Sequence, residues 1–567
     1  MSAMTSLPPG LILILGALAV PLLRGWLRSG YVLALPVLSF LHLVSLPHGT
    51  YLELDYFGLD IALVRVDRLS LVFGYIFHIA ILLGAIYALH VRGSIQHVAA
   101  LAYAGAAIGA VFAGDLMTLF IYWETTAIAS VFLILARGTE RALAAAIRYL
   151  IIQVGSGVLL LSGLLVVFQD TGTVAFQAMH LGGNLGPALI FLAFGIKCAF
   201  PLLHNWLQDT YPEATESGTV MLSAFTTKLA VYALARGFAG TEMLIWIGAL
   251  MTAFPIFYAV IENDLRRVLA YSLNNQLGFM VVGIGIGTEL SLNGTAAHAF
   301  SHILYKALLF MSMGAVLHRV GTVKGSELGG LYKSMPWTTA FCIVGAASIS
   351  AFPLFSGFIS KALIIGAAAD EGHVVVWLVL LFASAGVFHH SGIKIPYFAF
   401  FQHDSGKRCK EAPLNMLIAM AITAALCIGI GIFYRPLYAI LPFDVAYDPY
   451  TATHVVGQLQ LLLFSALAFG VLIRTGIYPP ELRSTNLDFD WIYRRVLPRL
   501  WRHVEAMATR GHAALWQGLQ ASVARAIETA YRHHGPQGML ARTWPTGSMV
   551  LWAAALLAAF TVIYYFR

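Results

Sequence analysis

The segment GIKCAFPLLHNW, residues 195–206, places a lysine and a proline within an otherwise apolar stretch. A second segment, ASISAFPLFSGFISK at 347–361, repeats the letters AFPL and again has a lysine close by. Proline interrupts a helix because it lacks an N–H donor and its ring clashes with the preceding turn. Paired interrupted helices in the two halves of a chain are typical of transport proteins built from inverted repeats. We therefore expect two repeats, each with a discontinuous membrane helix.

The composition predicts a polytopic membrane protein. Of the 567 residues, 59% are hydrophobic and 11% are charged, whereas soluble proteins carry about 25% charged residues. The formal net charge is +7, but Lys and Arg lie mostly between apolar runs, so membrane topology explains them better than nucleic-acid binding. Apolar runs long enough to cross the bilayer predict an all-α fold with about sixteen spans, at 9–28, 30–47, 68–91, 97–113, 115–136, 143–168, 186–205, 217–238, 242–260, 265–287, 294–318, 338–365, 372–402, 413–434, 454–474 and 547–566.

Basic residues between these runs predict the orientation of the chain. Under the positive-inside rule, the cytoplasmic loops should be the basic ones, as they are at Arg266 and Arg267 and at 407–410. The intervening loops are nearly free of Lys and Arg. One loop on the predicted cytoplasmic side, 206–216, is acidic instead. This pattern places both termini outside.

A segment of different composition separates the last two predicted spans. Residues 487–535 mix Arg and His with Trp, Leu and Val at helical spacing. This predicts an amphipathic helix along the cytoplasmic membrane surface, broken at Pro498; a plain connector helix packed against the protein is the alternative. The predicted organisation is N-terminal helices at 1–96, a first inverted repeat at 97–240, a second at 241–405, two spans within 406–486, the amphipathic helix at 487–546 and a final span at 547–567.

Charged and titratable side chains lie inside the predicted spans. A charge at the bilayer centre costs about 2.5–3.5 kcal/mol on insertion scales, so such residues need a reason. A row of Glu, Lys and His is what proton transfer through a membrane requires. The residues concerned are Glu124, Lys197, Lys228, His298, His302, Lys306, Lys361 and Lys394.

Other interpretations exist for some of these residues. A buried Lys–Glu pair at Glu124 could simply hold two helices together, and His298 could be a packing residue. Lys361 and Lys394 lie nearer span ends and could extend to the interface. His298 and His302 share one helix face, but they lack the glutamate of an HExxH zinc site, and Lys306 one turn further on would repel a cation.

The chain shows no sign of a cofactor. Its four cysteines have no CxxC spacing, and no Gly-rich nucleotide loop follows a strand pattern. We therefore expect neither a bound cofactor nor a metal ion.

Four segments resemble a known family. They are GDLMTLFIYWETTAIAS (114–130), the stretch from Ile196 to Arg236, NDLRRVLAYSLNNQLGFM (263–280) and AHAFSHILYKALLF (297–310). Together they are similar to the antiporter-like subunits of respiratory complex I, of Mrp-type cation/proton antiporters and of membrane-bound hydrogenases. The resemblance covers about residues 65–400 and implies two inverted five-helix repeats with interrupted helices. NLDFDWIYRR (486–495) resembles the segment that follows the core helices in the D-type subunits of Mrp antiporters and in hydrogenase-linked relatives.

The resemblance also assigns roles to individual residues. Gln276 departs from the family pattern, which often has histidine there, and YPEATES at 211–217 replaces a stretch that is often rich in Pro and Ala. Neither departure touches the predicted relay. The implied proton relay consists of Glu124 paired with Lys197, the connecting Lys228, then His298, His302 and Lys306, and the terminal Lys361.

The resemblance implies a proton-translocating subunit of a multi-subunit Na⁺/H⁺ antiporter, closest to the D type, in a bacterial cytoplasmic membrane. Its implied partners are other membrane subunits, the lipid bilayer, protons and Na⁺. A first alternative is a proton-pumping membrane-arm subunit of a complex I-like NADH:quinone oxidoreductase or of a membrane-bound hydrogenase. A second alternative is a membrane anchor for an inorganic-carbon uptake complex.

Overall fold

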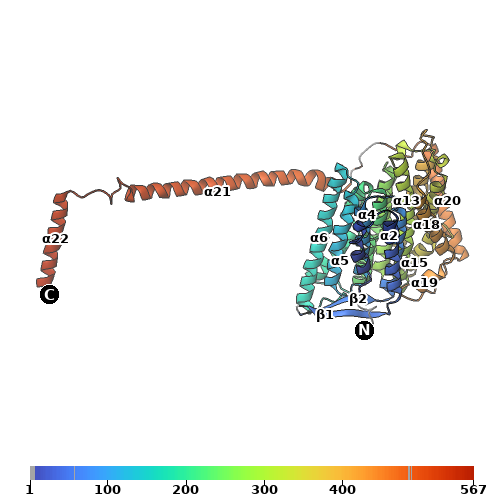
Figure 1. Cartoon of the computed structure of the whole chain (residues 1–567), viewed down its shortest axis with the longest axis horizontal. Helices are drawn as coiled ribbons and strands as arrows, with labels where there is room; N and C mark the ends of the chain where they lie inside the picture. The colour runs from blue at the N-terminus through green and yellow to red at the C-terminus, as the bar shows by residue number, and fades with distance from the viewer. Residues whose placement is uncertain (1–6, 57, 480, 483–485, 487, 567) are drawn as a thin grey trace. The chain divides into compact units, whose positions relative to one another are not determined.

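The computed structural model describes residues 7–56, 58–479, 481–482, 486 and 488–566, and most of them are helical. The chain divides into two compact units, Met1–Asn486 and Leu487–Arg567. In the first unit the long helices stand side by side, and a β-hairpin lies across one end of them (Figure 1). The predicted all-α membrane fold is confirmed, with this hairpin as the exception.

The first unit begins with helices that flank the hairpin and continues into the segment of the first AFPL motif. Its N-terminal elements are α1 (Leu11–Ala17), η2 (Val20–Leu22), α2 (Gly25–Val44), β1 (Gly49–Tyr56), β2 (Leu59–Val66) and α3 (Arg68–Tyr87). The strands pair antiparallel, with Gly49 opposite Val66. The next elements are α4 (Ser94–Val111), α5 (Leu116–Leu135), α6 (Glu140–Thr171), α7 (Leu185–Lys197), α8 (Asn205–Thr210), η3 (Tyr211–Glu213), α9 (Glu216–Ala224) and α10 (Thr226–Gly237).

The rest of the first unit contains the second AFPL motif. Its elements are α11 (Glu242–Ile261), α12 (Leu265–Ile286), α13 (Glu289–Val320), η4 (Gly325–Glu327), η5 (Leu331–Lys333), α14 (Pro336–Ile349), α15 (Ser356–Asp370), α16 (Val374–Val387), η6 (Phe388–Ile393), α17 (Lys394–Pro396), η7 (Tyr397–Phe401), α18 (Leu414–Ile432), α19 (Arg435–Ala439) and α20 (Ala452–Arg474). We call the end of the bundle with loops 88–93, 136–139, 261–264, 321–335 and 402–413 the basic end, and the opposite end the hairpin end.

Within the described residues, twelve helices are long and apolar enough to cross a membrane. The predicted count of sixteen is not confirmed, because four predicted spans fall on helices of another kind. α1 has only 7 residues, α7 and α14 are interrupted, and α12 carries the polar run 274–276 in its buried interior.

The two AFPL motifs form the same backbone turn. Ala199 and Leu202 have φ values of 61° and 71°, and Ala351 and Leu354 have 59° and 74°. The Phe200 N–H donates to the Gly195 carbonyl at 3.0 Å, and the Phe352 N–H donates to the Ala347 carbonyl at 3.1 Å. Because a left-handed conformation costs about 1–2 kcal/mol for a residue with a Cβ, its occurrence at matching positions is a strong repeat signal. The predicted discontinuous helices are confirmed.

The second unit consists of η8 (Ile492–Val496), α21 (Leu497–His534) and α22 (Thr546–Tyr565). Residues 490–534 are continuously helical, so the helix is not broken at Pro498 as predicted. The winding changes just before this proline instead, from π-helical in η8 to α-helical at Leu497. α21 has 38 residues and no buried side chain within the described part of its unit, and its placement along a membrane surface stays a prediction.

Candidate functional site

The predicted relay residues lie on the two interrupted spans and on other helices of the bundle. Glu124 is on α5, Lys197 is the last residue of α7, and Lys228 is on α10. His298, His302 and Lys306 lie on α13, and Lys361 lies on α15. Every one of these side chains except Glu124 is at most 1% exposed. The core of the bundle therefore encloses four lysines and two histidines.

Lys197 is held by α5 without contacting the carboxylate of Glu124. Its ammonium donates to the Trp123 carbonyl at 2.6 Å and to the Thr126 hydroxyl at 3.0 Å. It also lies 4.4 Å from the centre of the Trp123 ring, within cation–π range. Glu124 Oε1 is buried and has no hydrogen-bond partner among the residues that the structure describes. The predicted pairing of Glu124 with Lys197 is thus one of neighbouring helices and not a direct ion pair.

Lys228 follows a bend between α9 and α10. Its ammonium donates to the Ser223 carbonyl at 2.6 Å and to the Thr227 hydroxyl at 3.3 Å. The bend at Phe225 frees the Ser223 carbonyl from its helical role, since α10 restarts at Thr226. The lysine therefore caps the end of a helix segment in the protein interior.

His298, His302 and Lys306 form a stripe along one face of α13, but among the described residues they make no hydrogen bonds to one another. His298 Nδ1 lies 3.0 Å from the Ser360 hydroxyl, and the ring centroids of His298 and His302 are 6.1 Å apart. In the described part of the chain, neither ring nitrogen of His302 has a hydrogen-bond partner. The Tyr305 hydroxyl donates to Gln276 Oε1 at 3.0 Å, so the residue that departs from the family pattern lies beside the stripe.

Lys361 lies at the second interrupted helix, as Lys197 does at the first. Its ammonium donates to the carbonyl of Ile349, the last residue of α14, at 2.8 Å. It also lies 5.1 Å from the centre of the Phe279 ring. Each broken helix thus presents a buried lysine at its break, one supplied by the helix itself and one by the segment after the turn.

The structure corrects the interpretation of Lys394 as a residue that extends to the interface. Its side chain is fully buried, and its ammonium lies 2.9 Å from Glu481 Oε1. It also donates to the carbonyls of Val260 and Glu262, at 2.7 Å each, where α11 ends. No sequence pattern signals the pairing with Glu481, because that carboxylate belongs to the loop after α20.

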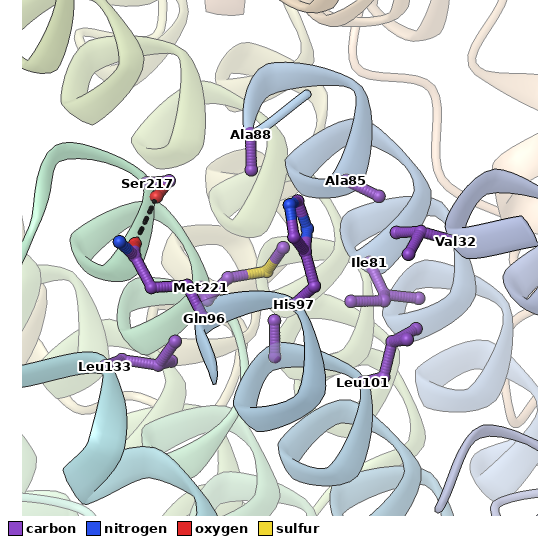
Figure 2. Close-up of a pocket in the computed structure, with 11 residues that line it drawn as sticks. Val32, Ile81, Ala85, Ala88, Gln96, His97, Leu101, Leu133, Ser217 and Met221 are labelled. Carbon is purple, nitrogen blue, oxygen red and sulfur yellow. Dashed lines mark hydrogen bonds between the residues drawn. The ribbon is translucent and has the colours of Figure 1, made fainter. Parts of the chain in front are cut away.

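Figure 2 shows a small cavity at the basic end, between α2, α3, α4 and α9. Gln96 Oε1 accepts hydrogen bonds from Thr215 and Ser217 at 2.8 and 3.0 Å, and His97 Nε2 lies 3.0 Å from the Val91 carbonyl. The cavity volume is about 10 Å³, room for one water at most. These polar groups therefore fasten the loop before α9 to α4 and leave no space for a ligand.

A larger cavity of ≈ 290 Å³ lies at the hairpin end. Arg65 and Arg236 line it, and both bind the Asp67 carboxylate, at 3.2 and 2.8 Å. Burial raises the pKa of Asp67, but the hydrogen bond and charge of Arg236 outweigh burial and hold the pKa below its usual value. Thr295, one turn before His298 on α13, also lines this cavity. The cavity thus reaches from the hairpin end to within one helical turn of the stripe.

Gly157 on α6 fixes the position of the Glu124 carboxylate. A Cβ placed on Gly157 would lie 1.5 Å from Glu124 Oε1, whereas a Cβ on Gly155 would meet nothing within 4 Å. The obstructed atom ends a flexible side chain, so the helices can stay in place while the carboxylate moves. If the predicted relay carries protons, we expect Gly157→Ala to lower their transport about tenfold without loss of assembled complex. This is less than the roughly 100-fold or greater effect of losing a proton-transfer group outright, because the carboxylate is displaced and not removed. Gly155→Ala is the matched control, and equal transport by both variants would show that the position of this carboxylate does not matter.

Comparison with known proteins shows which protein family the chain resembles. Residues 113–388 match the family described as NADH:quinone oxidoreductase/Mrp antiporter, TM. That segment contains all the predicted relay residues. The chain is 30% identical over 365 residues to the D subunit of the Na(+)/H(+) antiporter of Alkalihalophilus pseudofirmus, covering 60% of this chain and 73% of that relative.

Two further similarities concern larger assemblies. The chain is 27% identical over 352 residues to Hydrogenase-4 component B of Escherichia coli, covering 55% of this chain and 52% of that relative; it thus spans about half of that protein. A chain in the structure of the Mrp complex from Dietzia sp. superposes with a TM-score of 0.67 at 20% identity, covering 83% of this chain and 99% of that one. At this identity the superposition shows the fold alone.

Proposed function

The chain belongs to the NADH:quinone oxidoreductase/Mrp antiporter family of membrane subunits, and from this premise we propose that it translocates protons within a multi-subunit Na⁺/H⁺ antiporter. The observation that carries the proposal is the set of fully buried lysines without a carboxylate partner. Within the described residues, the ammonium groups of Lys197, Lys228, Lys306 and Lys361 are hydrogen-bonded only to hydroxyls and backbone carbonyls. A buried charge that serves structure alone is normally paired.

The proposed route follows these residues through the core. A proton passes from Glu124 to Lys197, on to Lys228, then through His302 and Lys306 to Lys361. His302 makes no hydrogen bond to any described residue through either ring nitrogen, so it can take a proton on one nitrogen and release one from the other. Sites four residues apart on α13 are separated by a rise of about 6 Å, a gap that one or two waters bridge.

The choice of Na⁺ rests on the similarity to the D subunit of an Na(+)/H(+) antiporter. A second candidate is a subunit of a redox-driven proton pump, favoured by the similarity to Hydrogenase-4 component B. Both candidates use the same relay and differ in what drives it: a cation gradient in one case, and electron transfer by partner subunits in the other.

The test uses the complex that co-purifies with the full chain, with its subunits identified by mass spectrometry. After reconstitution into liposomes loaded with Na⁺ and diluted into Na⁺-free buffer, Na⁺ leaving the lumen should drive protons inward and acidify it. A luminal dye reports the pH, and K⁺ in place of Na⁺ tests the choice of cation. Acidification that needs an electron donor and a quinone would replace the antiporter with the redox candidate, and no proton movement under either condition would overturn both.

A further inference from the structure

The helix that follows α15 changes its winding twice inside the bundle. η6 (Phe388–Ile393) and η7 (Tyr397–Phe401) are π-helical, and they flank the short α17. π-helical turns are rare and occur frequently at functional sites, because they re-aim side chains that a regular helix would direct elsewhere. Here they present His390 and Ser391 to the interior, and both are fully buried.

An unbroken chain of hydrogen bonds joins this segment to the relay. The Lys306 ammonium donates to the Ser272 hydroxyl at 2.8 Å. The Ser391 hydroxyl donates to the same Ser272 oxygen at 2.7 Å, and His390 Nδ1 lies 2.9 Å from Ser391 Oγ. These side chains come from three separate helical segments, α13, α12 and η6. Although His390 Nε2 is buried, it has no hydrogen-bond partner in the part of the chain that the structure describes.

One turn beyond His390, the same helix carries the Lys394–Glu481 ion pair. The Glu481 side chain is 4% exposed and belongs to the loop that follows α20 at the basic end. Glu262 lies at the same place, where Oε1 accepts from the backbone N–H groups of Asn263 and Asp264 at 3.0 and 3.1 Å. The hydrogen-bonded chain therefore points from mid-bundle toward two carboxylates at the end that the positive-inside pattern predicts to be cytoplasmic.

We propose that Ser272, Ser391 and His390 form a proton branch that connects Lys306 to the basic end of the bundle, with the Lys394–Glu481 pair at its mouth. This inference rests on the proposed function, because a branch has a use only if Lys306 carries protons. It assigns a role to residues that lie outside the row from Glu124 to Lys361.

The transfer balances without any other reactant. When Lys306 is a neutral amine, it takes the Ser272 hydroxyl proton. Ser272 is restored by the hydroxyl proton of Ser391, Ser391 by the Nδ1 proton of His390, and His390 Nε2 receives one proton from the basic end. A hydroxyl both donates and accepts, so rotation of the two serine hydroxyls, together with a turn of the His390 ring that brings its protonated nitrogen back to Ser391, resets the chain after each transfer. One proton enters, one reaches Lys306, and no electron moves.

A structural clamp for Lys306 is the competing explanation, and the surroundings argue against it. A clamp would need Ser272 alone, whereas the chain continues to a histidine whose far nitrogen stays unbonded among the described residues, which costs free energy in a buried site. The charged and titratable groups that act on His390 are Lys306, Lys361, Lys394 and His389. Three of these are lysines, so the histidine lies between the relay and the ion pair.

The test compares matched variants of the complex in the liposome assay. His390→Asn keeps a hydrogen-bond donor near the Nδ1 position but cannot pass a proton through a ring. Ser391→Ala removes the middle hydroxyl, and Ser391→Thr restores one. Ser384→Ala is the control, because Ser384 is a buried serine two turns earlier whose hydroxyl bonds to no described residue. We expect about tenfold or greater loss of proton flux in His390→Asn and Ser391→Ala, recovery in Ser391→Thr and no change in Ser384→Ala.

The outcomes separate the branch from the relay. If Lys228→Ala abolishes transport while His390→Asn and Ser391→Ala transport like the unmodified complex, the branch is wrong and the relay stands. If Lys228→Ala transports normally, the proposed function itself fails. Native gels of each complex show whether the subunit has assembled, and a His390→Asn complex that assembles and transports normally would support the clamp.

Discussion

Replacing Lys228 with alanine is expected to lower cation-driven proton flux by about 100-fold or more, the scale of losing an essential proton-transfer group. Lys228 is fully buried and, among the described residues, hydrogen-bonded only to the Ser223 carbonyl and the Thr227 hydroxyl. It lies in the chain between the first interrupted helix and the α13 stripe, so the proposed route has no alternative carrier at this point. Alanine leaves a small cavity and one unbonded carbonyl, so native gels of the complex must show that the subunit still assembles. The luminal pH of reconstituted liposomes measures the effect.

Two further variants separate proton transfer from simple positive charge. Lys228→Arg keeps the charge but does not release a proton at physiological pH, so it should also fail to transport. Lys324→Ala removes a half-exposed lysine from the loop after α13 and should leave the flux unchanged. Normal transport by Lys228→Arg would mean that this position needs only a charge, and the relay would then not pass through it.

The parts of the fold that were predictable follow from short-range patterns. Apolar runs located the helices, and the repeated AFPL letters located two breaks that share one backbone turn. Four-residue spacing placed His298, His302 and Lys306 on one face of α13. The hairpin β1–β2 was not predicted, because its strands of 8 residues each are too short to stand out as membrane spans.

The parts of the site that were not predictable depend on contacts between distant segments. Ser272 and Ser391 are ordinary serines in the sequence, and they form a chain only because α12 and η6 pack against each other near Lys306. Lys394 looked like a residue near a span end, because its partner Glu481 lies in a loop after another span. π-helical turns have no distinctive sequence signature, so the direction of the His390 side chain could not be predicted.

Arg266 is another residue whose long-range contacts could not be predicted, in this case from the positive-inside pattern. The positive-inside pattern treats it as a loop charge that sets orientation, yet its side chain is 1% exposed. Its guanidinium donates to the carbonyls of Tyr211, Pro212, Ala214 and Thr215 at 3.0–3.2 Å and to the Thr219 hydroxyl. It therefore holds the acidic loop between α8 and α9, the one loop at this end that lacks basic residues of its own.

Arg266→Ala is accordingly expected to cause the largest loss of stability among single substitutions at the basic end. It would leave several buried carbonyls without this donor, and each such group costs about 1–3 kcal/mol, so the free energy of unfolding should fall by about 3 kcal/mol or more. Arg137 keeps two of the carbonyls bonded, those of Pro212 and Ala214, which limits the loss. Arg266→Lys should be intermediate, because an ammonium lacks the planar fork of donors.

The measurement is the temperature at which the detergent-solubilised complex loses this subunit, with Arg92→Ala as the control. Arg92 is an exposed loop arginine at the same end, so its removal changes the basic charge by the same amount without unbonding a carbonyl. Equal melting temperatures for Arg266→Ala and Arg92→Ala would show that Arg266 acts as a topology signal and not as an anchor. A lower temperature for Arg266→Ala alone would show that Arg266 anchors this loop. The loop leads directly into α9 and α10, so the guanidinium would then also help to position the bend that precedes Lys228.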